Sequence, residues 1–320
     1  CRRGLVEPRF ARPPRTLAGV FLLTVLAGLP ACQPGAGEST APPGARVEAT
    51  GPDWELVYDL EHEGRTDLFT VGAGGGTPRR LTDDPAYDGM ARYTPDGALI
   101  VFSSQRGGHW QLWEIPAEGG APRQIRTNEA IEYQADPSPD GRELAFLSQL
   151  DGPERLVVTD RAGAGMREVV RHGKKTIFGN PSWSVDGDRI AFSSNWRIGH
   201  QIYVLDVASG ETRRISPMTS GGCEPRFMRD GRVCYVSRGH LRPTSRLVAH
   251  DLETGDEEVL VDWPAMSYDP AFSPDGTEIA FASNIGGNYA IYRQRLSDGQ
   301  AWRVTFGPGD ARYPDYRPKP

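Results

Sequence analysis

One short motif recurs through the chain at an almost constant interval, and it restricts the fold more than any other feature. Asp-Gly pairs stand at positions 96/97, 140/141, 186/187, 230/231 and 275/276, so successive glycines are 44, 46, 44 and 45 residues apart. A period of forty-odd residues is typical of the four-stranded blade of a β-propeller. The repeat therefore predicts an all-β fold built from blade-sized units.

The most regular copy of the repeat, residues 269–283, shows what each part would do. Ser273-Pro274-Asp275-Gly276 suits a type I turn, because proline presets φ at the second position and glycine accepts the left-handed one. Ala271-Phe272 would end the strand before the turn, and Ile279-Ala280-Phe281 would begin its partner. This second segment is apolar on both faces of the pleat, as expected for a sheet that neighbouring blades cover on both sides.

The first and last segments of the repeat region are incomplete and complement each other. Residues 54–58, 67–71 and 80–82 would form three strands with no inner strand before them. Five complete units follow, with inner strands near 90–94, 135–138, 180–184, 224–228 and 269–273. Residues 312–318 match an inner strand alone. We expect this last strand to pair with the N-terminal strands, which closes a six-bladed β-propeller and leaves no sheet open.

Residues 1–31 have the pattern of a signal peptide. A basic segment precedes a 13-residue apolar run from Leu17 to Leu29, which is too short to span a bilayer. The following Leu29-Pro30-Ala31-Cys32 resembles the bacterial lipobox, in which the cysteine is lipidated and becomes the first mature residue. Pro30 is unusual there, so cleavage without lipidation is the alternative. Because Gln33 suits outer-membrane sorting, we expect a periplasmic protein lipid-anchored at Cys32 to the outer membrane.

Residues 32–52 are small, polar and rich in proline and glycine, so we expect a flexible tether before a propeller domain over residues 53–320. Residues 1–31 carry five arginines and one glutamate, a net +4, so their removal takes the formal charge from −6 to −10. An acidic chain without a basic stripe argues against a nucleic-acid partner. We expect a monomer that touches the membrane through its lipid alone.

Two cysteines lie within the repeats. Cys234 stands in Val233-Cys234-Tyr235, where other units have Ala191 and Ala280 between an isoleucine and a phenylalanine. The comparison favours a small buried residue between blades. A disulfide between Cys223 and Cys234, which export would permit, is the alternative.

The recurrent core, an aromatic residue followed by Ser-Pro-Asp-Gly and then Ile-Ala-Phe as in residues 272–281, resembles the TolB-type propeller repeat, a relative of WD-type blades. The resemblance covers nearly all of the chain after the tether. It implies a cell-envelope protein that binds a protein or peptide partner at its channel mouth, as TolB docks a peptidoglycan-associated lipoprotein. TolB itself has an α/β domain before its propeller, where this sequence has the short tether.

The candidate site is the end of the channel at which loops lead into the inner strands. Polar and aromatic residues stand at these positions, with the aromatic ones as anchors and the polar ones setting specificity. The predicted partner-binding residues are Tyr87, Asp88, Tyr133, Gln134, Asn180, Glu224, Tyr268, Asp269, Arg312 and Tyr313. The alternative is that these side chains cap strand ends and hydrate the channel. A lesser alternative is a cation such as Ca²⁺ held by Glu224 and Asp269.

A basic loop adds to the same face. Residues 238–246 carry Arg238, Arg242 and Arg246, which could recognise a carboxylate or an acidic partner, or could simply be solvated.

Catalytic motifs are scarce. The sequence has no G-x-S-x-G elbow, and its six histidines fall in different units without metal-ligand spacing. We therefore predict a non-enzymatic protein without a metal or other cofactor. The alternative is a hydrolase or lyase that acts on peptide or oligosaccharide in the central channel.

Overall fold

The computed structural model describes residues 54–319 except 151, 172, 174–175, 197–198, 219–220 and 239–242. The predicted signal peptide, the tether and Cys32 lie outside the described residues. The described residues form strands, turns and loops, and none of them belongs to a helix that could cross a membrane.

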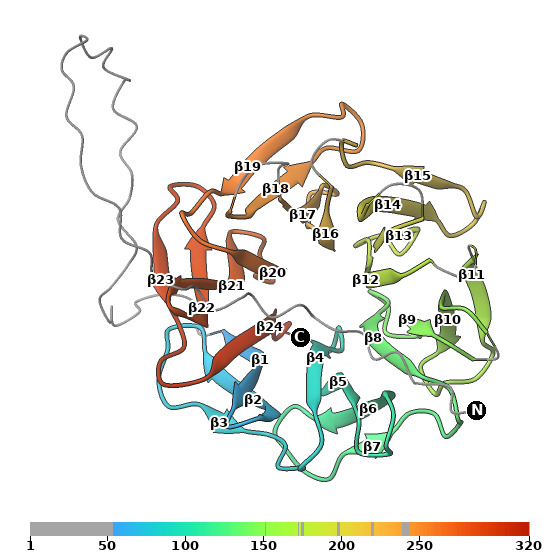
Figure 1. Ribbon diagram of the computed structural model, residues 1–320, viewed down its shortest axis with the longest axis horizontal. Helices are drawn as coiled ribbons and strands as arrows, with labels where there is room; N and C mark the ends of the chain where they lie inside the picture. The colour runs from blue at the N-terminus through green and yellow to red at the C-terminus, as the bar shows by residue number, and fades with distance from the viewer. Residues whose placement is uncertain are drawn as a thin grey trace, which may run out of the picture. The chain divides into compact units, whose positions relative to one another are not determined.

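Six four-stranded antiparallel sheets stand around a common axis as the blades of a propeller, as predicted (Figure 1). Blade 1 contains β24 (Asp310–Tyr316), β1 (Glu55–His62), β2 (Arg65–Gly72) and β3 (Arg79–Arg80). Blade 2 contains β4 (Asp88–Tyr93), β5 (Leu99–Ser104), β6 (Gln111–Pro116) and β7 (Arg123–Gln124); blade 3 contains β8 (Glu132–Pro137), β9 (Glu143–Ser148), β10 (Arg155–Asp160) and β11 (Arg167–Arg171). Blade 4 contains β12 (Phe178–Trp183), β13 (Arg189–Ser194), β14 (Gln201–Asp206) and β15 (Thr212–Arg214). Blade 5 contains β16 (Cys223–Phe227), β17 (Val233–Ser237), β18 (Arg246–His250) and β19 (Glu257–Val261); blade 6 contains β20 (Ser267–Phe272), β21 (Glu278–Gly286), β22 (Asn288–Arg295) and β23 (Ala301–Arg303).

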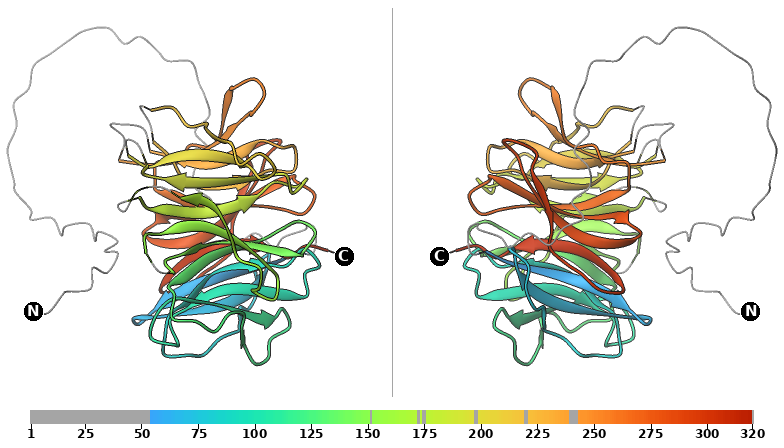
Figure 2. Two further views of the ribbon diagram at one scale, coloured as in Figure 1. Left: turned by 90° about the vertical axis from the view of Figure 1, so that its right-hand side faces the viewer. Right: turned by 90° about the vertical axis from the view of Figure 1, so that its left-hand side faces the viewer.

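The ring closes where β24 pairs with β1, so the predicted closure is confirmed. Leu56 pairs with Tyr316 and Val57 with Asp315 in an antiparallel register. The ring of Trp54 meets that of Tyr316 edge-on, with centroids 5.6 Å apart. The first blade is thus completed by the last strand of the fold, and Figure 2 shows this blade among the others from the side.

A bulge interrupts every inner strand. In each, one residue that is not glycine has a positive φ of 48–56°, a conformation that side-chain-bearing residues rarely adopt. These six residues are Met90, Gln134, Asn180, Glu224, Asp269 and Tyr313. Each inner strand starts one to three residues before the predicted position, because pairing continues on the N-terminal side of the bulge.

The Ser-Pro-Asp-Gly turn joins the two inner strands of a blade at the end away from the bulges. In blade 6, the Gly276 amide donates to the Ser273 carbonyl at 2.8 Å, and Gly276 has a φ of +74°. The Ser273 hydroxyl donates to the Asp275 carboxylate at 2.7 Å and accepts from the Glu278 amide at 2.9 Å. The repeated motif is therefore mainly a self-bonded turn.

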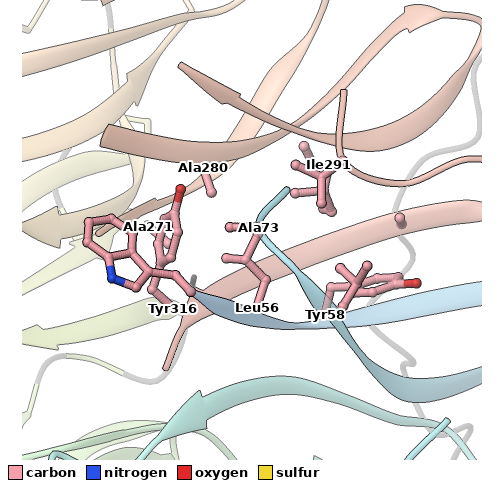
Figure 3. Close-up of a cluster of buried hydrophobic side chains, with 12 residues drawn as sticks. Leu56, Tyr58, Ala73, Ala271, Ala280, Ile291 and Tyr316 are labelled. Atoms are coloured by element: carbon pink, nitrogen blue, oxygen red, sulfur yellow. The ribbon is translucent and has the colours of Figure 1, made fainter. Parts of the chain in front are cut away.

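The core lies between neighbouring blades. Figure 3 shows one cluster, in which Leu56, Tyr58 and Tyr316 of blade 1 pack with Ala280 and Ile291 of blade 6. The largest side chains of the second strands are almost completely buried; they are Tyr58, Phe102, Phe146, Phe192, Tyr235 and Phe281. The prediction that these apolar segments pack blade on blade is confirmed.

The two described cysteines are free thiols, so no disulfide joins them. Cys234 is fully buried with Val236 and Ile279, in the cluster between blades 5 and 6. Its predicted role as a small buried residue is confirmed.

Candidate functional site at the channel mouth

The six bulge residues form a ring around the channel, near the loops that lead into the inner strands. A bulge leaves a backbone amide without its ladder partner, and that amide needs another acceptor. In three blades, the bulge side chain of the preceding blade supplies it. Gln134 accepts from the Asn180 amide at 2.8 Å, Glu224 from the Asp269 amide at 2.7 Å, and Asp269 from the Tyr313 amide at 3.3 Å.

Two other bulges find their acceptor on the second strand of the preceding blade. The Asp59 carboxylate accepts from the Met90 amide at 2.9 Å, and the Ser103 hydroxyl accepts from the Gln134 amide at 3.0 Å. Several polar residues of the predicted ring therefore hold one blade to the next. This is a structural role beyond the capping and hydration considered from the sequence.

The ring position of blade 2 belongs to Met90, not to Asp88. In each complete unit the bulge lies seven residues before the turn glycine, and Met90 has this spacing from Gly97. Asp88 lies two residues earlier with its side chain fully buried, 2.6 Å from the Arg106 guanidinium. The sequence-based choice of Asp88 as a ring member followed its polarity rather than the repeat spacing. Likewise, Tyr313 occupies the ring position next to Arg312.

Arg312 is the centre of a cluster at the mouth. Its Nε donates to the Asp269 carboxylate at 2.6 Å, and its Nη2 lies 3.9 Å from the Glu224 carboxylate. Its guanidinium also lies 4.8–5.4 Å from three ring centroids, those of Tyr268, Tyr289 and Tyr313. Even so, the Arg312 side chain is 28% exposed. The cluster therefore presents a fixed positive charge to solvent.

The position of Arg312 argues against the predicted cation alternative. Its guanidinium lies by both Asp269 and Glu224 and supplies the positive charge that Ca²⁺ would have brought. Within the described part of the chain, no three His, Cys, Asp or Glu side chains are placed to hold a metal ion.

The predicted aromatic residues differ in exposure. Tyr268 and Tyr313 are buried, at 6% and 9% exposure, so they support the cluster rather than project from it. Tyr87 is half-buried against Trp110, and Trp110 lies 6.3 Å from the ring of Tyr133. The Tyr133 hydroxyl donates to Glu154.

Eight of the ten predicted residues fall into two groups, whereas Tyr87 contacts Trp110 and Asp88 pairs with Arg106. Glu224, Tyr268, Asp269, Arg312 and Tyr313 meet in one cluster from blades 5, 6 and 1. Gln134 and Asn180 are joined by a hydrogen bond between blades 3 and 4, with Tyr133 next to Gln134. Sequence reasoning did not single out Tyr289, which completes the aromatic support of Arg312.

Two carboxyl groups near the mouth are protonated more readily than usual. Burial, together with the charge of Asp269, raises the pKa of Glu224 to about 8 although Arg312 opposes the shift. Burial also raises the pKa of Asp59 well above its usual range, with a further contribution from Asp269. Asp59 reaches the Met90 amide beside Gly89, where a Cβ atom would lie only 2.4 Å from the Asp59 carboxylate.

A second polar layer lies two residues along each inner strand. There, Arg226 of blade 5 pairs with Asp136 of blade 3 and with Asp315 of blade 1, both at 2.6 Å. Neither blade is next to blade 5, so the Arg226 side chain crosses the channel. The same aspartates accept the backbone amides of Trp183 and Tyr93 in the following blades.

Sequence reasoning missed this brace, although the repeat contained a signal for it. Five residues before the turn glycines, the units carry Arg92, Asp136, Ser182, Arg226 and Ala271. Opposite charges in one column of a closed ring indicate ion pairs across its axis.

Comparison with known proteins agrees with this architecture. Residues 49–175 match the PD40 family, described as the TolB β-propeller domain. The crystal structure of TolB from Acinetobacter baumannii superposes with a TM-score of 0.73 over 83% of this chain and 67% of that chain, at 19% identity. This chain is a TolB-like six-bladed β-propeller.

Relatives of this TolB-like propeller carry different names. The Tol-Pal system protein TolB of Francisella tularensis subsp. mediasiatica is 28% identical over 205 residues, 49% of this chain and 47% of that protein. The uncharacterized peptidase YuxL of Bacillus subtilis (strain 168) is 26% identical over 151 residues, 36% of this chain and 23% of that protein. The chain therefore spans less than half the length of these two curated relatives.

Proposed function

We propose that this protein is a non-enzymatic binding module that holds a protein or peptide partner at the mouth of its propeller channel. The Arg312 cluster carries the proposal: the Arg312 side chain is 28% exposed, and its guanidinium is fixed by Asp269 and lies near three tyrosine rings. Such a side chain loses little freedom on binding, and an arginine with aromatic support is typical of binding hot spots. The Arg226 brace lies beneath, so a partner would dock on the mouth rather than thread the channel.

The proposed setting is the cell envelope. The signal-like segment and lipobox-like Leu29-Pro30-Ala31-Cys32 support export and lipid anchoring to the outer membrane. The name of the Francisella relative, a Tol-Pal system protein, supports an envelope protein as the partner. Fractionation of a Cys32→Ser variant tests the anchor: the protein should leave the membrane fraction, whereas unchanged membrane retention would exclude lipidation at Cys32 as its cause.

The binding proposal is tested by pull-down from envelope extracts. A Tyr87→Ala, Tyr289→Ala variant removes two half-buried rings from the mouth and should recover at least about tenfold less partner, a loss of about 1.4 kcal/mol. The matched control is Val185→Ala, which changes an exposed side chain on a turn at the opposite end of the propeller. Equal recovery by wild type and the double variant, with both folded by circular dichroism, would place the partner elsewhere.

A second candidate function is hydrolysis or elimination in the channel. It is favoured by Glu224, because a carboxyl with a pKa of about 8 beside Asp269 suits general acid–base chemistry near neutral pH. The peptidase relative adds support for peptide as the substrate class. Turnover of peptides or oligosaccharides that is lost in Glu224→Gln would establish it. Absence of turnover by the wild type at high protein concentration would exclude it for the substrates assayed.

A further inference from the structure

We propose that the mouth recognises an acidic segment of its protein partner, whose carboxylates pair with Arg238 and Arg312 beside Tyr268. This inference rests on the proposed function and names the chemistry of the partner. It joins residues from three successive blades: Arg238 follows β17, Tyr268 lies in β20 and Arg312 in β24.

Among the described residues, no carboxylate pairs with Arg238. Its guanidinium lies 5.2 Å from the centroid of the Tyr268 ring, and the residue is exposed. It forms no hydrogen bond or ion pair with any other residue that the structure describes. Most arginines in the described part of the chain have a carboxylate or carbonyl partner, so one that contacts only an aromatic ring there is available for an external anion.

Arg312 keeps binding capacity on the same tyrosine. Its guanidinium lies 5.1 Å from the Tyr268 centroid, and only its Nε makes a close bond, to Asp269. Its Nη2 is 3.9 Å from Glu224, which is longer than a hydrogen bond. Burial raises the pKa of Glu224 and so reduces the negative charge beside Arg312. Arg238 and Arg312 therefore bring two positive charges to one tyrosine ring on an acidic protein.

The adjoining rim favours a protein over another polyanion. Ile177, Trp196 and Met218, on loops of blade 4 and the loop leading to blade 5, are 50%, 37% and 53% exposed. Asn195 accepts a hydrogen bond from the Ile177 amide at 2.8 Å, which holds the first two loops together.

The rim also continues to the arginine site. The Gly222 amide donates to the His200 carbonyl at 2.8 Å and joins the blade 4 loop to the segment before Glu224. Exposed apolar side chains on these loops, together with two guanidiniums at Tyr268, match a segment with acidic and apolar residues. An oligosaccharide of uronic acids would use the arginines and leave the apolar rim uncovered.

Fluorescence anisotropy with the full mature chain tests the inference. The probe is a labelled synthetic peptide of glutamate, glycine and leucine, and the comparison is the same peptide with glutamine in place of glutamate. We expect the glutamate peptide to bind at least about tenfold more tightly, and Arg238→Gln to weaken it about tenfold. The control is Arg142→Gln, an arginine that is 86% exposed near a turn at the opposite end, and it should leave affinity within about twofold.

Three outcomes would overturn the inference: equal affinity for the glutamate and glutamine peptides, equal affinity of wild type and Arg238→Gln, or tighter binding of an oligogalacturonate competitor than of the peptide. The proposed function is separable from it. If envelope partners are lost in the Tyr87→Ala, Tyr289→Ala variant but retained fully by Arg238→Gln, the mouth binds a protein and the acidic-segment inference is wrong.

Discussion

Glu224 combines a structural bond with an unusual protonation state. Its carboxyl accepts the Asp269 amide and lies near Arg312, yet burial and the Asp269 charge raise its pKa to about 8. The unfolded chain releases this proton near the ordinary glutamate pKa of about 4.3. Between these two values the folded state binds more protons than the unfolded state, so the Glu224 contribution lowers stability as pH rises. Above the folded-state pKa, the effect levels off.

The Glu224→Gln variant should remove this pH dependence. Glutamine keeps an acceptor for the Asp269 amide but cannot ionise, so from pH 5 to pH 8 the variant should lose less stability than wild type, by on the order of 2 kcal/mol. Urea unfolding at both pH values measures the difference, with Glu253→Gln as an exposed control. If the free energy of unfolding changed equally with pH in wild type and Glu224→Gln, Glu224 would not be the group that holds the proton.

Among the elements, inner strands of blades that are not neighbours are linked by ion pairs between their side chains. Arg226 on β16 links β8 and β24 through Asp136 and Asp315, and all three side chains are largely buried. Those aspartates also accept amides of β12 and β4. One arginine therefore stabilises contacts that involve five of the six inner strands.

Replacing Arg226 by methionine should destabilise the fold by about 3 kcal/mol, because Asp315 loses its close countercharge and Asp136 keeps only Arg92, whose Nε is 3.8 Å away. Urea unfolding monitored by tryptophan fluorescence measures the loss. Adding Asp136→Asn and Asp315→Asn should recover part of it, since the unpaired charges are then removed. Arg142→Gln serves as the surface control. If Arg226→Met lost no more unfolding free energy than Arg142→Gln, the ion pairs of Arg226 would add nothing to stability.

Local chemistry explains which elements the sequence could predict. The turn at Ser273–Gly276 makes its hydrogen bonds locally, within residues 273–278, so the hairpin was predictable from the motif itself, and the five-fold recurrence of the motif predicted the blades. The bulge at Asp269 was not, because its amide is satisfied by Glu224, 45 residues away in another blade. The pairing of Arg226 with Asp315 spans 89 residues and needs the closed ring to form.

For the molecule as a whole, closure depends on a single strand. β24 covers the free side of β1, and Tyr313 and Tyr316 on this strand are buried. At about 2 kcal/mol for each buried aromatic side chain, these two residues alone contribute on the order of 4 kcal/mol.

Ending the chain at Gly309 should therefore abolish cooperative unfolding and lead to association through the exposed edge of β1. Size-exclusion chromatography and thermal unfolding report both effects. A chain that ends at Pro318 keeps β24 and should behave as wild type. If the shorter chain remained monomeric with an unchanged unfolding midpoint, β24 would not be what closes the ring.

The pairing of β1 with β24 also predicts that the propeller tolerates circular permutation. The Arg317 amide donates to the Glu55 carbonyl at 2.8 Å, so the two ends of the propeller lie side by side. A short linker between them, with new termini between Gly119 and the exposed Gly120 in blade 2, would give a circular permutant with the same ring. Circular permutation would then change the order of the blades along the chain without changing their order around the ring. A fusion partner could be attached at whichever blade carries the new termini.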